Sequence, residues 1–495
     1  MAITVCLALV GCERPTPAVT IVTVGPPPPT PLVTAAGENR PAATSPLPTY
    51  VGTPTPDPTR PPTDIADGNY LSHTVAYGET LTTIAQLYGS SVEELMQING
   101  LESADFLYAG QSLLVPGGQT AVGPSFKIIP DSELVYGPAA QSFDLAAVAN
   151  GGYLSQHQEE VEGQMLAGLQ VVQLVADRFS VSPRLLLAAL EYRAGWLTQP
   201  AANHLPYVMG YIKTGYEGLY QQLAWAADKL NGGYYGRAEG GLRLVQIDDG
   251  TRVNFAPDIN DGTAGVQNWL AHHTGATYQG WLEETGQAGF FATFSRLFGN
   301  PFAYTVEPLW PAGLTQPPLR LPWAAGETWY FTGGPHGGWA SGSAWAALDF
   351  VPLNEQLGCY DSDAWVIAAG PGLVTRSGFG AVVVDLDGDG YAGTGWAVTY
   401  MHLAARDRVA AGTVVNAGDP LGHPSCEGGF SNGTHVHLSR TYNGRWVAAD
   451  GPIPFVLSGW VSQGLGREYD GLLVHGEEVK EACECREEGN AITGD

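Results

Sequence analysis

One short stretch decides how the C-terminal part of the chain folds: Thr434-His435-Val436-His437-Leu438-Ser439. Polar and apolar residues alternate along it, which is the pattern of a β-strand whose successive side chains point to opposite faces. His435 and His437 then share one face, and Val436 and Leu438 share the other. Two imidazoles on one face can divide the labour, because one can bind a metal ion while the other moves protons.

Three more residues with potential metal or proton chemistry precede this strand. They are His402 in Thr399-Tyr400-Met401-His402-Leu403, Asp349 in Leu348-Asp349-Phe350, and His336 in Gly333-Gly334-Pro335-His336-Gly337-Gly338. Short β-rich segments surround them from about residue 320 to 460, and Gly-rich turns separate these segments. The pattern predicts an antiparallel sheet with long loops.

Together, the four places resemble the lysostaphin-type (LytM-like) metallopeptidases, and the resemblance spans roughly residues 328–455. Family glycines match as well, for example in Asn432-Gly433-Thr434-His435. The resemblance implies that zinc is held by His336, Asp349 and His437. Three protein ligands would leave a fourth position open for water, as in catalytic zinc sites.

The same resemblance gives His402 and His435 catalytic roles. His435 would be the general base, and His402 would stabilise the oxyanion or help to protonate the leaving amine. The sequence departs from the family in one respect, because twelve residues separate His336 from Asp349 where the family usually has three. His423 is a rival ligand, but its position falls in a variable turn of the family, so we expect His336 to be the ligand.

An acidic stretch in the same region imitates the start of a calcium-binding loop: Asp385-Leu386-Asp387-Gly388-Asp389-Gly390. The twelfth position of such a loop normally supplies a bidentate Glu, whereas this sequence has Trp396 there. We therefore interpret the stretch as a hairpin turn that carries several carboxylates.

Residues 69–117 predict a small domain with the order strand, helix, helix, strand. Thr80 is a suitable N-cap for a helix with an apolar stripe. The segment resembles a LysM domain over its whole length, which implies binding of N-acetylglucosamine-containing glycans between two loops. The implied contact residues are Gly78, Glu79, Thr80, Leu81, Phe106, Leu107, Tyr108, Ala109 and Gly110. The alternative is a βααβ fold that binds no ligand.

Residues 125–318 predict a mostly helical domain, and Ser182-Pro183 is a typical helix start. Two stretches resemble the lysozyme-like lytic transglycosylases, whose general acid is a Glu. Arg193 occupies that position here, and Glu191 lies about 200° away around the helix. Since an Arg cannot protonate a glycosidic oxygen, we expect this domain to be inactive and to hold glycan or position the next domain.

The N-terminal residues 1–12 combine a short apolar run with Leu9-Val10-Gly11-Cys12, which looks like a bacterial lipobox. The expected outcome is a signal peptide and lipidation of Cys12, and the alternative is an ordinary secretory signal with a chance Cys. Residues 13–68 are rich in Pro and Thr, which is typical of an extended linker.

The remaining cysteines fit an oxidising compartment. Cys359 and Cys426 lie in the same expected domain and are a natural disulfide pair. Cys483 and Cys485 are too close in sequence for an easy mutual bond.

The expected architecture is multidomain: a βααβ LysM domain, a mostly α middle domain, a mainly antiparallel β metallopeptidase domain at 320–461, and an acidic tail at 462–495. The formal charge of -27 argues against a nucleic-acid partner, because phosphate contacts need a basic surface. The membrane would be reached only through the lipid anchor.

The resemblances imply an extracellular, cell-surface lipoprotein associated with the wall, which hydrolyses peptide bonds of peptidoglycan with a zinc ion. The alternative is a non-catalytic wall-binding scaffold or a regulator of other wall hydrolases. A complete set of metal ligands is the feature that separates the two.

Overall fold

The computed structural model describes residues 70–75, 79–88, 92–101, 103, 107–108, 110–116, 121–148, 151–353 and 357–495. The expected signal segment with Cys12 and the linker at 13–68 lie outside these residues. All described residues belong to one compact unit. Among the helices in the described ranges, none is both long and apolar enough to cross a membrane.

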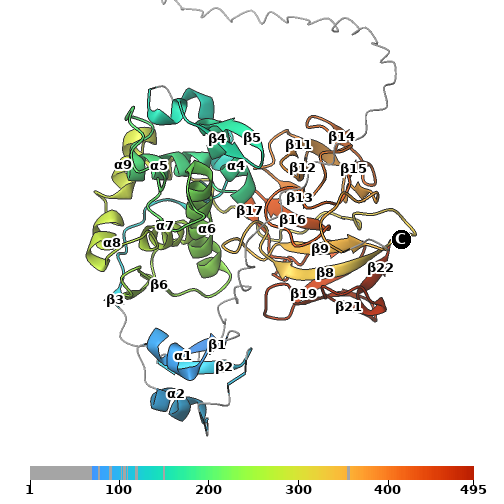
Figure 1. The fold of residues 1–495 in the computed structure, drawn as a ribbon, viewed down its shortest axis with the longest axis horizontal. Helices are drawn as coiled ribbons and strands as arrows, with labels where there is room; N and C mark the ends of the chain where they lie inside the picture. Colours follow the sequence, from blue (N-terminus) through green and yellow to red (C-terminus); the bar gives the residue numbers. More distant parts are fainter. Residues whose placement is uncertain are drawn as a thin grey trace, which may run out of the picture. The chain divides into compact units, whose positions relative to one another are not determined.

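The first described domain has the predicted order of strand, helix, helix and strand (Figure 1, blue). Its elements are β1 (Tyr70–Thr74), α1 (Leu81–Leu87), α2 (Val92–Asn99) and β2 (Ser112–Pro116). The two strands pair antiparallel, and Leu81, Ile84 and Leu95 pack against β2 residues in a small core. The side-chain amide of Asn99 exchanges two hydrogen bonds with the backbone of Leu114 and so fastens α2 to β2.

The middle domain is mainly helical. Its helices are α3 (Asp131–Leu134), α4 (Gly168–Phe179), α5 (Pro183–Ala194), α6 (Leu219–Ala238), α7 (Asp261–Ala271), α8 (Tyr278–Glu284) and α9 (Phe290–Phe298). Shorter elements are β3 (Ala121–Val122), η1 (Pro138–Ala140), η2 (Leu145–Ala147), η3 (Tyr153–Ser155), β4 (Gln158–Val161), β5 (Gln164–Ala167), β6 (Leu244–Gln246), β7 (Arg252–Asn254) and η4 (Pro301–Tyr304). As the sequence predicts, α5 begins with Ser182 as N-cap and Pro183 at its first position.

The C-terminal part is built on a nine-stranded sheet with the order β14-β11-β12-β13-β16-β9-β8-β22, in which β17 also pairs with β16 (Figure 1, yellow to red). The strands are β8 (Thr328–His336), β9 (Ala347–Pro352), β11 (Gly372–Gly378), β12 (Ala381–Asp385), β13 (Trp396–Met401), β14 (Val414–Val415), β16 (Val436–Tyr442), β17 (Arg445–Trp446) and β22 (Ala491–Thr493). β10 (Val366–Ile367) pairs with β15 (Pro420–Gly422) beside it. All these pairs are antiparallel, as the sequence predicts.

The register of the central strands places the chemical residues together. β16 lies between β13 and β9, so His437 faces Asp349 on one side and Met401 on the other. Val436 and Leu438 point to the opposite face and are fully buried in the core under the sheet. The alternation that the sequence predicts therefore separates the core face from the face with the histidines.

The residues expected to form an acidic tail are folded. A second sheet runs β18 (Val456–Leu457), β19 (Trp460–Gly464), β20 (Gly471–His475) and β21 (Glu478–Glu481), and it lies along β8 (Figure 1). After η5 (Glu488–Asn490), β22 returns to pair with β8 in the main sheet. The interpretation of residues 462–495 as a tail is wrong, because apolar residues such as Leu473 and Ile492 join the buried core.

Candidate active site

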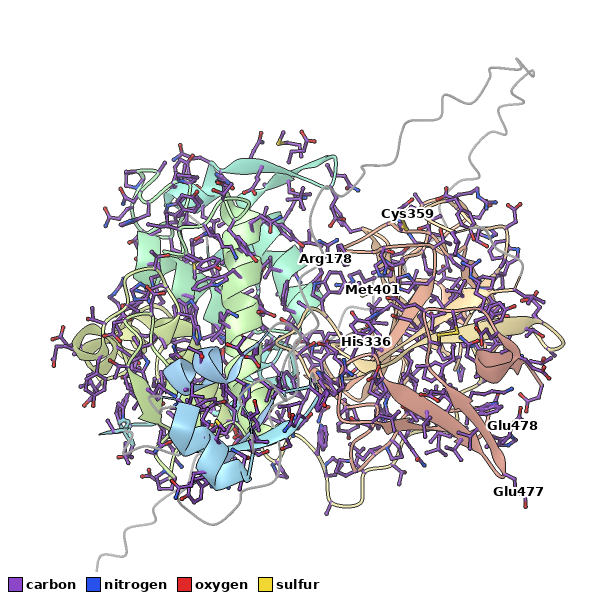
Figure 2. The ribbon with its side chains drawn as sticks, turned by 60° about the horizontal axis from the view of Figure 1, so that its bottom comes forward. Arg178, His336, Cys359, Met401, Glu477 and Glu478 are labelled. Atoms are coloured by element: carbon purple, nitrogen blue, oxygen red, sulfur yellow. A yellow bond between two sulfur atoms is a disulfide. The ribbon has the colours of Figure 1, made fainter. Side chains whose placement is uncertain are left out.

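Three neighbouring strands bring His336, Asp349 and His437 into one buried cluster (His336 is labelled in Figure 2). His336 is the last residue of β8, Asp349 lies in β9, and His437 lies in β16. His336 Nε2 is 2.9 Å from His437 Nδ1. Each of these nitrogens is 3.3 Å from Asp349 Oδ1. Three potential ligand atoms therefore surround one small space.

Backbone carbonyls fix which nitrogen of each ring carries a proton. His336 Nδ1 bonds to the carbonyl of Gly334 at 2.8 Å, and His437 Nε2 bonds to the carbonyl of Gly338 at 3.1 Å. Because a carbonyl oxygen can only accept, these two nitrogens are the donors. The other nitrogens, His336 Nε2 and His437 Nδ1, then present lone pairs to each other when the rings are neutral.

This arrangement fits a cation. Two facing lone pairs and a carboxylate oxygen repel one another, and Asp349 Oδ1 is buried without a hydrogen-bond partner. Burial raises the pKa of Asp349, but His336 and His435 lower it more, so the pKa lies well below its ordinary value and the group is a carboxylate. Zinc bonds of about 2.0–2.1 Å to N and O imply ligand separations of about 3.3 Å in a tetrahedron. The separations in the cluster are 2.9 and 3.3 Å.

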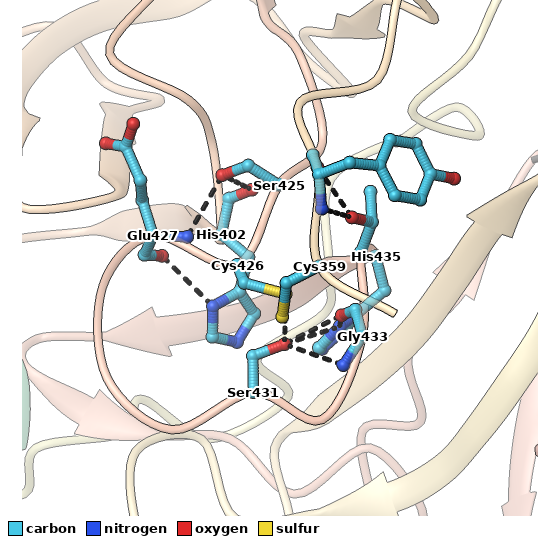
Figure 3. Close-up of a disulfide and its surroundings, with 10 residues drawn as sticks. Cys359, His402, Ser425, Cys426, Glu427, Ser431, Gly433 and His435 are labelled. Carbon is cyan, nitrogen blue, oxygen red and sulfur yellow. Dashed lines mark hydrogen bonds between the residues drawn. A yellow bond between two sulfur atoms is a disulfide. The ribbon is translucent and has the colours of Figure 1, made fainter. Parts of the chain in front are cut away.

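His402 and His435 form a second pair of histidines at the edge of this cluster. Figure 3 shows these two rings. Their ring centroids are 4.4 Å apart, and His435 Nε2 is 3.7 Å from Asp349 Oδ1. His435 Nδ1 donates to the carbonyl of Gly433 at 2.7 Å, and His402 Nδ1 donates to that of Glu427 at 3.1 Å. Both rings therefore keep Nε2 as the nitrogen with a lone pair.

The backbone around this pair differs in detail from a continuous strand. β16 begins at Val436, so His435 lies just before it and pairs only through a single bridge to Ser425. His402 follows β13 directly and has a φ of 63°, a left-handed conformation that is costly for a residue with a side chain. The amide of Ser425 donates to the carbonyl of His402 at 2.6 Å and holds this turn.

The expected disulfide is present in this segment (Figure 3). Cys359 and Cys426 have their Cα atoms 5.6 Å apart. Ser431 Oγ lies 3.4 Å from the sulfur of Cys426 and donates to the carbonyl of Gly433 at 2.7 Å. The disulfide thus anchors the segment whose carbonyls orient the two histidines.

Removing this bond should lower stability more than it lowers zinc binding. For a closed loop of 67 residues, the chain-entropy model gives about 4 kcal/mol of stabilisation. We therefore expect the double variant Cys359→Ser, Cys426→Ser to lose up to about 4 kcal/mol of unfolding free energy, while a metal site on β8, β9 and β16 persists. Chemical denaturation and metal analysis under oxidising conditions check this. Two free thiols in the unaltered chain would contradict the assignment.

Comparisons with known proteins find similarity in several parts of the chain. The family model described as "LysM domain" matches residues 73–116, and the one described as "LasA, N-terminal domain" matches residues 127–311. Protease LasA of Pseudomonas aeruginosa strain PAO1 is 26% identical over 339 residues, which cover 65% of this chain and 75% of LasA. Beta-lytic metalloendopeptidase of Lysobacter enzymogenes is 29% identical over 160 residues, which cover 31% of this chain and 83% of that enzyme. Over these residues the chain is similar to protease LasA, and its middle part is similar to the N-terminal domain of LasA.

Two further similarities accompany this relation. N-acetylmuramoyl-L-alanine amidase sle1 of Staphylococcus epidermidis is 45% identical over 53 residues, 11% of this chain and 16% of sle1. The solved structure of the M23 metalloprotease pseudoalterin is 28% identical to this chain, with a TM-score of 0.29. The match covers 34% of this chain and 96% of the pseudoalterin chain.

The LasA relation changes the interpretation of the middle domain. The matching family there is the LasA N-terminal domain, whereas the sequence suggested a lysozyme-like shell. The two residues that carried that suggestion are used structurally: the carboxylate of Glu191 accepts from the amides of Leu197 and Thr198, and Arg193 makes two bonds to Glu284.

The rival ligand His423 lies elsewhere. Its Nδ1 bonds to the carbonyl of Ala364 at 2.8 Å, its ring packs on Trp365 with centroids 4.0 Å apart, and its Nε2 is 3.6 Å from Asp407 Oδ2. Within the described residues, it does not join the cluster of His336, Asp349 and His437. The long spacing between His336 and Asp349 is taken up by a loop at 337–346.

The acidic stretch at 385–390 is a turn between β12 and β13. Asp385, Asp387 and Asp389 gather their carboxylates, but these accept hydrogen bonds from amides of the same turn. Burial, followed by the hydrogen bond to Asp385, raises the pKa of Asp387 to about 6. These contacts agree with a hairpin turn.

Sequence reasoning missed two residues near the metal cluster, because they belong to the supposed tail. The ring of Tyr469 stacks on the imidazole of His336, with centroids 4.2 Å apart and planes 19° apart. Glu468 Oε1 accepts from the amide of Gly337 at 3.1 Å. Cys483 and Cys485, which we judged too close in sequence for an easy mutual bond, are joined in a disulfide with their Cα atoms 4.9 Å apart.

The predicted glycan loops of the LysM domain are only partly described, since Gly78, Phe106 and Ala109 lie outside the described residues. Glu79 binds His73, with 2.8 Å between Oε2 and Nε2. Tyr108 is 68% exposed and sits next to the turn at Gly110, whose amide donates to Val75. Leu81 is buried in the core, so its side chain is structural and not a glycan contact. In the sequence, Thr80 follows Glu79 and Leu107 precedes Tyr108.

Tyr108 gives a direct test of this surface. Because an exposed aromatic ring offers an apolar platform to a sugar, we expect Tyr108→Ala in the full chain to weaken binding to purified peptidoglycan by about fivefold or more, the effect of losing about 1 kcal/mol. Sedimentation with insoluble wall at increasing concentrations measures it. The matched control is Tyr70→Ala on β1, which lies away from the predicted loops and should bind as before. Equal binding by all three proteins would contradict the assignment.

Proposed function

We propose that the protein is a zinc-dependent endopeptidase that hydrolyses peptide bonds of bacterial peptidoglycan and is held at the wall by its LysM domain. The observation that carries the proposal is the meeting of His336, Asp349 and His437, whose potential ligand atoms lie 2.9 and 3.3 Å from one another. A metalloendopeptidase also fits the relation to LasA and to beta-lytic metalloendopeptidase. The alternative, a non-catalytic scaffold, would be favoured by a broken ligand set, and here three candidate ligands come together.

The residues would share the reaction as follows. Held by His336, Asp349 and His437, a zinc ion would act as a Lewis acid toward the scissile carbonyl and would lower the pKa of a water molecule. His435 Nε2 has a lone pair on the cluster side, so it can take the proton of the attacking water. His402 Nε2 also carries a lone pair and can donate only after receiving a proton. Once it carries a proton, His402 can either stabilise the oxyanion or give that proton to the leaving amine.

The compartment belongs to the same proposal. A LysM domain and the LasA relation support an extracellular, wall-associated protein. We further propose that Cys12 carries a lipid anchor and that residues 13–68 give the domains reach into the wall. Labelling with a lipid precursor in a bacterial host tests the anchor, and loss of the label in Cys12→Ala supports it.

The activity is tested with purified peptidoglycan. The full chain should release new amino termini from the wall peptides, and a chelator should abolish the release. Release of new reducing ends with no new amino termini would contradict an endopeptidase and point to cleavage of glycan.

A further inference from the structure

The loop at 337–346, between β8 and β9, touches a candidate metal ligand. The carbonyl of Gly338 accepts the hydrogen bond from His437 Nε2. Internal bonds give this loop its shape: the amide of Gly338 donates to the carbonyl of Ala344 at 3.0 Å, and the amide of Trp339 donates to Ser343 Oγ at 3.0 Å. The position of the Gly338 carbonyl therefore depends on the whole loop.

The middle domain holds the same loop from outside. Asp228 on α6 accepts from the amide of Gly342, with 2.7 Å between Oδ1 and N. The ring of Trp339 lies 4.8 Å from the guanidinium of Arg178 on α4 (labelled in Figure 2). A Cβ at Gly342 would lie 2.0 Å from the carbonyl oxygen of Asp228, so the close approach requires glycine there.

The contact between the middle domain and the C-terminal part is also apolar and buried. Trp339, Trp446 and Met401 belong to the same buried cluster as Phe179 of the middle domain. The indole nitrogen of Trp446 donates to the carbonyl of Phe179 at 3.2 Å. A Cβ on Gly338 would meet the Trp446 ring at 2.6 Å, so this interface packs directly against the backbone that orients His437.

We infer that the middle domain is a positioning element of the metal site. Asp228 holds the Gly342 amide and Arg178 packs on Trp339 of the loop, which fixes the Gly338 carbonyl and so raises the affinity of His437 for the metal. The inference rests on the proposed function, since it concerns the same metal site. A ligand imidazole whose second nitrogen has a fixed acceptor keeps the correct tautomer and orientation. A displaced loop would free His437 to rotate or to direct an N–H at the metal.

The test compares zinc dissociation constants in the full chain, measured by competition with a chromogenic chelator. Asp228→Ala removes the acceptor of the Gly342 amide, and we expect binding to weaken about tenfold, the lower end of the effects of such outer contacts. Asp228→Asn keeps Oδ1 as an acceptor and should stay within about twofold of the unaltered chain. Gly342→Ala disturbs the same contact from the loop and should resemble Asp228→Ala.

The matched control is Glu239→Ala. Glu239 pairs with Arg445 at 2.9 Å, so it joins the same two domains, but the contact lies outside the loop. This variant should bind zinc as tightly as the unaltered chain. Unchanged affinity in Asp228→Ala and Gly342→Ala, or an equal loss in Glu239→Ala, would overturn the inference. Failure of the unaltered chain to bind zinc would contradict the proposed function instead. Unfolding curves of the metal-free proteins verify that each variant is folded.

Discussion

Replacing His437 with Ala is expected to remove zinc and activity together. The variant loses one of three ligand atoms and leaves His336 Nε2 and Asp349 Oδ1 facing an empty position. Two ligands in this buried space cannot complete the arrangement of a catalytic zinc site. Zinc per chain should fall from about one to near zero after dialysis, and peptide cleavage should fall to background. Metal analysis and amino-terminus release on the same samples measure both quantities.

The rival ligand provides the matched control. His423 is also a buried histidine of the same domain; its Nδ1 bonds to the carbonyl of Ala364, and its Nε2 lies 3.6 Å from Asp407 Oδ2. His423→Ala should keep its zinc and its activity, apart from any loss of stability. If His423→Ala lost zinc while His437→Ala retained it, the ligand set proposed here would be wrong.

Replacing His435 with Ala should separate metal binding from catalysis. His435 Nε2 is 3.7 Å from Asp349 Oδ1, and its other nitrogen is held by Gly433, so the ring borders the cluster without completing it. The variant should keep zinc but lose the group that accepts the proton of water. Loss of a general base typically costs about 10²–10⁴-fold in rate.

Zinc content and activity of His435→Ala and His437→Ala together test which histidine binds the metal and which accepts the proton. Loss of zinc in His435→Ala with retention in His437→Ala would mean that the two roles are reversed. Retention of zinc and full activity in both would exclude the metallopeptidase interpretation of β16. Unfolding curves of both proteins show whether a loss reflects the site or the fold.

The main sheet and the cluster could be predicted because local patterns encode them. Alternation along Val436–Tyr442 separates a core face from a polar face, and the isolated residues His336, Asp349 and His402 mark neighbouring strands. Their mutual contacts follow once β16 pairs with β9 and β13. The small LysM domain could be predicted equally well, because its strands and helices follow from patterns of neighbouring residues.

Other features depend on contacts between distant parts of the chain. Tyr469 stacks on His336 from a segment that looked like a tail, and Asp228 reaches Gly342 from another domain. Local sequence patterns do not report such pairings. Every residue has a backbone carbonyl, so the sequence does not indicate which carbonyl will accept a hydrogen bond. The acceptors that orient His437 and His435 were therefore found only in the structure. The lysozyme-like interpretation of the middle domain rested on a weak local match and stays a prediction, while residues 127–311 match the model of the LasA N-terminal domain.

The most direct test of the central claim is a titration of the metal-free full chain with zinc, in which the release of new amino termini from purified peptidoglycan is followed. A single catalytic site formed by His336, Asp349 and His437 predicts that activity rises linearly and stops rising at about one zinc per chain. Activity that is already complete in the metal-free chain would contradict the account. So would a zinc-loaded chain that releases no amino termini.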